Sequence, residues 1–141
     1  MAYKIGWYIE GEITYAQCIS PCSAEEFRAG LEEIDAYLEQ GKRPLIHTIV
    51  DLTRLEETIG LVKMAQAIKG RKPNPRTGWV IMVGEQNKVI RFSASVVRQV
   101  LQMRQRSFDT LEEALDFLHY IDSGIDWSKA DDRVFSHQSQ V

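Results

Sequence analysis

The sequence is poor in the residue types that mark disulfide-stapled and metal-binding proteins. Its 141 residues include two cysteines, three histidines and four prolines. Cys18 and Cys22 are separated by three residues, which matches neither a redox Cys-x-x-Cys pair nor half of a zinc site. Because thiols in a reducing compartment normally stay reduced, we expect no disulfide. Since the spacing matches no metal-binding pattern, we also expect no metal, and we expect no cofactor.

Long apolar runs and an excess of charge of one sign are also missing. No stretch approaches the roughly 18 uncharged apolar residues of a membrane-spanning helix, and residues 1–15 hold no apolar signal core. The net charge of −3 argues against a nucleic-acid binder, which is usually basic. These absences predict a cytoplasmic protein with no stable membrane anchor and no nucleic-acid partner.

Short apolar runs alternate with helical patterns along the chain. Runs 45–51 and 79–83 are almost continuously apolar, as is typical of strands buried on both faces. The expected strands cover 3–9, 12–20, 45–51, 79–83 and 103–108, and the expected helices 24–40, 58–69, 87–101 and 110–121. The order β-β-α-β-α-β-α-β-α predicts an α/β fold with a single mixed, mostly parallel five-stranded sheet.

Helical spacing also predicts which side chains are buried and where the domain ends. In helix 58–69 we expect Leu61, Met64, Ala65 and Ile68 to face inward, and in helix 87–101 Val89, Ser93, Val96, Val97 and Val100. After Gly124 the composition turns polar. We therefore expect a domain over residues 1–123 and a polar C-terminal tail over 124–141, which Trp127 and Phe135 dock in part.

Three segments resemble the STAS superfamily, and within it the SpoIIAA-like branch. They are the strand ending IVDLTRL, the strand WVIMVG and the closing segment RSFDTLEEALDFL. The resemblance covers about residues 3–121. It implies the fold of the bacterial anti-sigma-factor antagonists, and a regulatory module that is not an enzyme and acts through contacts with a protein partner.

In phospho-regulated members of that family a D-S-S-G-like turn follows a strand, and a kinase partner phosphorylates a serine there. Thr58 falls where that serine would be, Glu57 replaces the aspartate, and Gly60 matches the glycine. The candidate regulatory or partner-contact residues are Asp51, Thr53, Glu57, Thr58 and Gly60. The residue types alone favour a local structural role, because Asp and Thr often cap helices. We expect Thr58 in the first turn of helix 58–69.

Four basic residues lie in the loop before strand 79–83, namely Lys69, Arg71, Lys72 and Arg76. A charged surface loop is the simplest interpretation, and the alternative is contact with an anion or an acidic partner. In a parallel sheet this loop lies opposite the edge where the strands end. This placement disfavours a single site shared with Thr58.

Motifs of catalysis are absent from the sequence, which contains no G-x-S-x-G, H-E-x-x-H or glycine-rich nucleotide loop. His47 lies inside run 45–51, so we expect a buried, hydrogen-bonded histidine. The leading hypothesis is a non-enzymatic regulatory or protein-binding module. The alternative is a lipid- or small-ligand-binding domain with an apolar groove between helices and sheet. A closed core would favour the first hypothesis, and a continuous apolar pocket the second.

The opening hairpin, residues 3–20, is rich in aromatic side chains. Trp7, Tyr8 and Tyr15 lie on its two strands. Aromatic side chains on a strand suit either a core or an interface. The hairpin is therefore the candidate contact of a homodimer.

Overall fold

The computed structural model describes residues 3–19, 23–55, 57–85 and 87–135. Five strands form one sheet in the order β1-β2-β3-β4-β5. The strands are β1 (Tyr3–Ile9), β2 (Ile13–Cys18), β3 (Ile46–Asp51), β4 (Thr77–Val83) and β5 (Arg104–Phe108). β1 pairs antiparallel with β2, and all later neighbours are parallel. The predicted mixed α/β sheet is confirmed.

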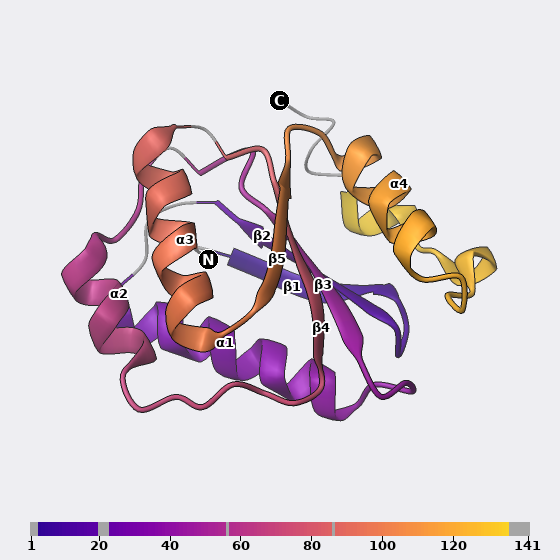
Figure 1. Cartoon of the computed structure of the whole chain (residues 1–141), viewed down its shortest axis with the longest axis horizontal. Helices are drawn as coiled ribbons and strands as arrows, with labels where there is room; N and C mark the ends of the chain where they lie inside the picture. The colour runs from indigo at the N-terminus through magenta and orange to yellow at the C-terminus, as the bar shows by residue number, and fades with distance from the viewer. Residues whose placement is uncertain (1–2, 20–22, 56, 86, 136–141) are drawn as a thin grey trace.

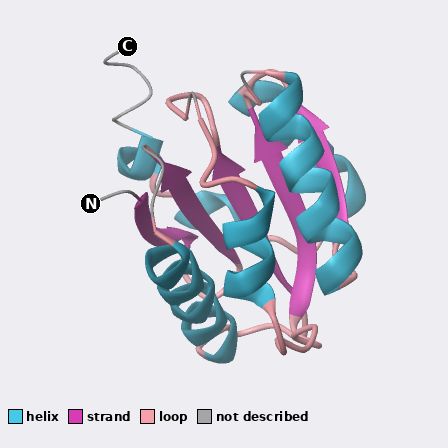
Figure 2. Cartoon of the chain, turned by 90° about the vertical axis from the view of Figure 1, so that its left-hand side faces the viewer, coloured by secondary structure: helices cyan, strands magenta, loops and turns pink. Residues whose placement is uncertain are grey.

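Helices cover both faces of this sheet. They are α1 (Ala24–Glu39), α2 (Leu61–Ile68), α3 (Lys88–Leu101) and α4 (Leu111–Ile121). Figure 1 shows α1, α2 and α3 on one side of the strands and α4 on the other. Figure 2 looks onto the side that carries the first three. In the described part of the chain, no helix is long and apolar enough to cross a bilayer.

Side-chain caps fix where three of the helices begin. Ser23 accepts a hydrogen bond from the backbone N–H of Glu26, whose side chain accepts one from the N–H of Ser23, which is a capping box. Asn87 caps α3 by accepting a hydrogen bond from the N–H of Ile90, and Thr110 caps α4 by accepting one from the N–H of Glu113. These polar residues satisfy N–H groups that lack a partner in the first helical turn.

The buried stripes of α2 and α3 differ from the predicted ones. In α2 the buried residues are Met64, Ala67 and Ile68, whereas Leu61 is 42% exposed and Ala65 is exposed. In α3 the buried residues are Ile90, Ser93, Ala94, Val97 and Leu101, whereas Val89 and Val100 are exposed. Almost every residue of α2 is apolar, so spacing alone cannot select one stripe.

The densest part of the core lies on the α4 face of the sheet. Ile49 and Ile81 of the central strands are fully buried there with Ala114 and Leu118 of α4. On the opposite face the buried residues form two separate clusters. The α4 face therefore carries the largest buried cluster of the described residues, while the larger open space lies under α1, α2 and α3.

The described part of the C-terminal segment packs on the α4 face. The ring of Phe135 lies 4.6 Å from that of Tyr8 and 5.0 Å from that of Tyr15, measured between centroids. The backbone N–H of Asp131 donates to the carbonyl of Tyr8 over 2.8 Å. The aromatic residues that suggested a dimer contact thus pack within the chain, since Trp7 also contacts Tyr37. Dimerisation through hairpin 3–20 stays a prediction.

Candidate functional site

An apolar cavity of about 410 Å³ lies between the sheet and helices α1, α2 and α3. Its volume falls within the roughly 300–1,000 Å³ of small-molecule sites. Side chains alternate between the faces of a strand, so every second residue of the central strands reaches it. The strand residues that line it include Ala16, Thr48, Val50, Val80 and Met82.

The walls of the cavity come from the three helices on this face. The lining side chains are Phe27, Leu31, Ile34 and Leu38 of α1, Met64 of α2, and Ile90, Ala94, Val97 and Leu101 of α3. Small residues leave the space open, because Ala16 and Ala94 stand where larger apolar residues would fill it. That pattern of small inward residues is the one sequence signal that could have predicted the cavity.

Asp51 closes the turn at the end of β3. One carboxylate oxygen accepts hydrogen bonds from the backbone N–H of Thr53, over 2.9 Å, and from its hydroxyl, over 2.6 Å. The other oxygen accepts from the hydroxyl of Tyr15. Burial first, and then the Asp51 carboxylate, raise the pKa of Tyr15 well above its ordinary value, so its hydroxyl remains a donor. Asp51 and Thr53 serve the turn itself.

Thr58 does not lie in the first turn of α2, and that prediction is wrong. The helix begins at Leu61, and its N-cap is Gly60, which makes no side-chain cap. Gly60 has φ 89° and ψ 154°, a backbone conformation open almost only to glycine, so the helix cannot continue backward. The Thr58 hydroxyl instead accepts a hydrogen bond from the N–H of Gly60 over 3.2 Å. Glu57 is exposed.

The basic loop is fastened to α1 by two of its arginines. Arg76 donates to the carbonyls of Glu39, the last residue of α1, and of Gly41 and Arg43 in the segment after it, over 3.1, 3.0 and 2.6 Å. Arg71 pairs with Asp35 of α1. These internal bonds occupy much of the charge that the sequence offered to an external anion.

The basic loop lies at the end of the sheet where the parallel strands begin, because it precedes β4. The loop around Thr58 lies at the end where they finish, because it follows β3. Arg71 and Lys72 nevertheless line the same cavity as Glu57 and Thr58. Residues of both loops thus line one cavity, an arrangement that the sequence disfavoured. The cavity runs beneath the helices and reaches both edges.

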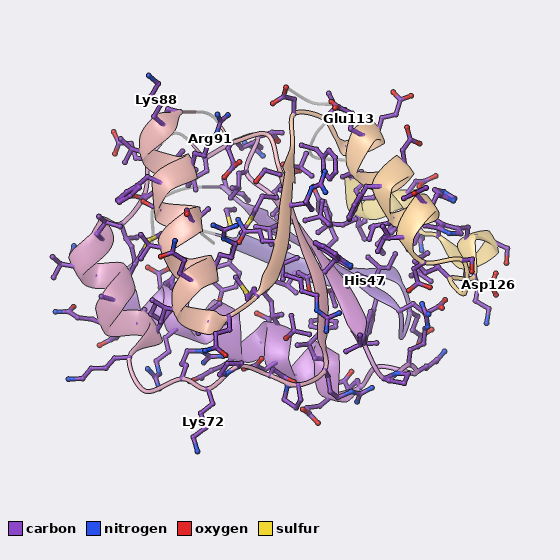
Figure 3. The ribbon with its side chains drawn as sticks, viewed as in Figure 1. His47, Lys72, Lys88, Arg91, Glu113 and Asp126 are labelled. Carbon is purple, nitrogen blue, oxygen red and sulfur yellow. The ribbon has the colours of Figure 1, made fainter. Side chains whose placement is uncertain are left out.

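Lys69 and Arg76 do not line the cavity. Lys69 and Lys72 are exposed, and Figure 3 shows the Lys72 side chain pointing away from the body of the protein. Asp35, the partner of Arg71, was missed from the sequence. An acidic residue beside the apolar stripe of α1, one position after Ile34, is the signal that marks it.

His47 lies on the other face of the sheet and holds the end of α4. Its Nδ1 accepts a hydrogen bond from the backbone N–H of Trp79 over 3.0 Å, and its Nε2 lies 2.8 Å from a carboxylate oxygen of Asp122. Arg43 binds the other oxygen of Asp122 over 2.8 Å. Burial lowers the pKa of His47, and the Arg43 hydrogen bond holds the pKa of Asp122 far below its usual value. His47 is thus a neutral Nε2–H donor.

Among the described residues, no three His, Cys, Asp or Glu side chains form a group that could hold a metal ion. Cys18 lines the cavity. Cys22 lies outside the described residues. The absence of a disulfide between them stays a prediction.

No protein-family model and no curated protein matches the chain. Solved structures do. One is an uncharacterized protein of the DUF3478 family with a SpoIIAA-like fold from Shewanella loihica, with a TM-score of 0.54 and 18% identity over 82% of this chain and 93% of that one. Another is the anti-sigma factor antagonist SpoIIAA in its unphosphorylated form, with a TM-score of 0.52 and 16% identity over 86% of this chain and 99% of that one. The chain therefore has a SpoIIAA-like fold.

Proposed function

We propose that the chain is a non-enzymatic binding module that holds a small, largely apolar ligand between its sheet and helices α1 to α3. The observation that carries this proposal is the cavity of about 410 Å³, whose floor and walls are mainly aliphatic and aromatic. Concave apolar pockets with a few polar groups are typical of small-molecule sites.

The polar residues of the fold support a binding role over catalysis. Tyr15, His47 and Asp51 are the buried groups best suited to acid–base chemistry, and each is engaged in hydrogen bonds within the protein. None of these three lines the cavity. A ligand there would meet aliphatic walls and a few charged side chains such as Asp35, Glu57 and Arg71, which suit binding and orientation.

A neutral fluorescent probe, N-phenyl-1-naphthylamine, tests this function without relying on charge. The probe should bind the wild-type protein, and Ala16→Leu should abolish binding because the added side chain occupies the cavity. Ala36→Leu, on the exposed side of α1, is the matched control and should bind normally.

Stability adds a second readout to the same variants. Where open space exists, Ala16→Leu should leave the free energy of unfolding unchanged or raise it. A closed core would be overpacked and would lose about 1–3 kcal/mol. A destabilised Ala16→Leu protein that still binds the probe would refute the proposal.

A regulatory, protein-binding role is the second candidate. SpoIIAA, one of the structures that share this fold, is an anti-sigma factor antagonist. Leu52, Leu55 and residues 57–59 of the loop after β3 line one end of the cavity, and Thr58 is among them. A ligand below this loop would alter the surface offered to a partner protein, so the two functions are compatible.

The test of this second candidate compares Thr58→Glu with Thr58→Ser in pull-downs from the native host. A partner that Thr58→Ser retains and Thr58→Glu loses, with both variants folded, supports a switch at the loop. Equal capture by both variants contradicts it. A cytoplasmic location and a homodimer through hairpin 3–20 belong to this proposal, and sedimentation of the protein as a pure monomer would exclude the homodimer.

A further inference from the structure

We propose that the ligand of this cavity is a single-chain anionic amphiphile of the fatty-acid type, whose carboxylate binds Arg71 while its chain extends toward the Thr58 loop. This inference rests on the proposed function, because it assigns a direction and a chemical class to the ligand of the same cavity. It draws on the charges at the two ends of the cavity and on the contacts of Arg71.

The two ends of the cavity differ in charge. At the edge where the parallel strands begin, the lining residues include the largely buried Arg71 and the exposed Lys72, whose side chain points outward (Figure 3), with Asp35 as the acid among the described residues. At the opposite edge the charged lining residue among those described is Glu57. An anionic head group is therefore favoured at the end near Arg71 and disfavoured near Glu57.

Arg71 has unused capacity for an anion. Its side chain is only 12% exposed. One terminal nitrogen, Nη2, binds Asp35, whereas the buried Nε meets no acceptor among the described residues. A guanidinium carries five N–H donors in a plane and matches a carboxylate in geometry. A buried donor without an acceptor is unfavourable, so a second carboxylate would complete the contacts of this side chain.

Asp35 competes with the ligand carboxylate for the Arg71 guanidinium. Its second oxygen accepts a hydrogen bond from the amide of Asn74 over 3.1 Å, so the aspartate keeps a partner when Arg71 turns toward a ligand. Removal of the Asp35 charge should therefore strengthen anion binding. A purely structural ion pair would show no such gain.

The space between the two ends suits one apolar chain. From Arg71 inward the cavity is bordered by aliphatic residues such as Ile34, Val80 and Met82. Its volume of about 410 Å³ lies near the lower end of the roughly 300–1,000 Å³ range of ligand sites. A single medium-length chain fits this volume better than a lipid with two chains.

Three compounds with one tail and different heads test the head-group assignment. Decanoate, 1-decanol and decylammonium compete with bound N-phenyl-1-naphthylamine at physiological salt and neutral pH. Decanoate should displace the probe at a concentration at least about tenfold lower than decanol, the factor expected of one hydrogen bond to a charged group. Decylammonium should be the weakest of the three.

Three variants identify the residue that reads the head group. Arg71→Gln should remove the advantage of decanoate over decanol, whereas Asp35→Asn should increase it. Lys69→Gln removes one positive charge from the same loop outside the cavity, and should leave both affinities unchanged. Urea unfolding of each variant confirms that the compared proteins are folded.

The outcomes separate this inference from the function on which it rests. Failure of the neutral probe to bind would overturn the proposed function and this inference together. Probe binding with equal displacement by decanoate and decanol would overturn only the head-group assignment. So would a loss of decanoate affinity in Asp35→Asn as large as that in Arg71→Gln, because both variants would then act by breaking a structural pair.

Discussion

Single buried polar residues hold the ends of the secondary structure in place. His47 joins β3 to β4 and to Asp122, and Asp51 joins the end of β3 to Tyr15. The sequence predicted a buried, hydrogen-bonded His47, because a lone histidine in an apolar run needs partners. It could not predict Asp122 as the partner, since the two residues are 75 positions apart.

His47 should make stability depend on pH. Burial lowers its pKa in the folded protein, assisted by the nearby Arg43 and Arg104 and opposed by Asp122. Below its ordinary pKa of about 6.5 the unfolded chain binds a proton that the folded protein resists. The free energy of unfolding should therefore fall as pH decreases from about 7.5 to about 5, and urea titrations at several pH values measure this slope.

His47→Gln is the matching variant for that slope. It lacks the titrating group, so its free energy of unfolding should be lower overall but flatter over the same pH range. A variant that retains the wild-type slope would show that another group causes the pH dependence.

Gly60 determines the local structure through its backbone conformation. Its φ of 89° is strained for any other residue, although no atom lies within 4 Å of where a Cβ would stand. Gly60→Ala should therefore reduce the free energy of unfolding by about 1–3 kcal/mol, from backbone strain alone.

Gly6 in β1 provides the control for Gly60. It also has open space at its Cβ position, but its φ is not positive. Gly6→Ala should be neutral or stabilising in the same thermal or urea unfolding experiment. If both substitutions have the same effect, the backbone conformation assigned to Gly60 is wrong.

At the scale of elements, the sequence predicted most boundaries well and those of one helix, α2, poorly. Apolar runs and capping residues located the strands and α1, α3 and α4, because those signals are local. α2 lacks a side-chain cap and begins three residues later than predicted, at Leu61. The buried stripes of α2 and α3 depend on where each helix sits over the sheet, which helical spacing does not specify.

The basic loop shows that charge in a connection can be structural. Arg76 binds the last carbonyl of α1, at Glu39, where a cation also complements the helix dipole, and the carbonyls of Gly41 and Arg43 in the segment that follows. Arg76→Gln should lower the free energy of unfolding by about 2 kcal/mol, since hydrogen bonds to charged groups contribute about 1.5–3 kcal/mol.

Lys69→Gln changes the same charge in the same loop at an exposed position. Its free energy of unfolding should stay within about 0.5 kcal/mol of the wild type. Equal losses in both variants would mean that the overall charge of the loop, and not the contacts of Arg76, supports α1.

At the scale of the whole molecule, the two faces of the sheet have different tasks. The α4 face carries the main buried cluster and the described part of the C-terminal segment, whereas the other face keeps the larger cavity. The sequence predicted the fold class through element order and resemblance. It offered an apolar groove only as the alternative to a closed core and could not decide between them, because open volume is the small difference between the space among the helices and the side chains that fill it.

The C-terminal segment should act as part of the folded domain up to Phe135. Phe135 packs on Tyr8 and Tyr15, and its neighbour Asp131 bonds to the backbone of β1. Phe135→Ala should therefore reduce the free energy of unfolding by about 1–2 kcal/mol, less than a fully buried phenyl ring would, because Phe135 is partly exposed.

Phe92 on α3 is the matched control for Phe135, because its side chain is 58% exposed. Phe92→Ala should change stability by less than about 0.5 kcal/mol. Urea unfolding followed by circular dichroism measures both variants, and the comparison is matched because each variant removes one phenyl ring. Equal small effects would place the domain boundary near residue 123 and leave the tail undocked in solution. A large loss confined to Phe135→Ala would extend the domain through residue 135, with hairpin aromatics Tyr8 and Tyr15 covered by the chain's own C-terminal segment.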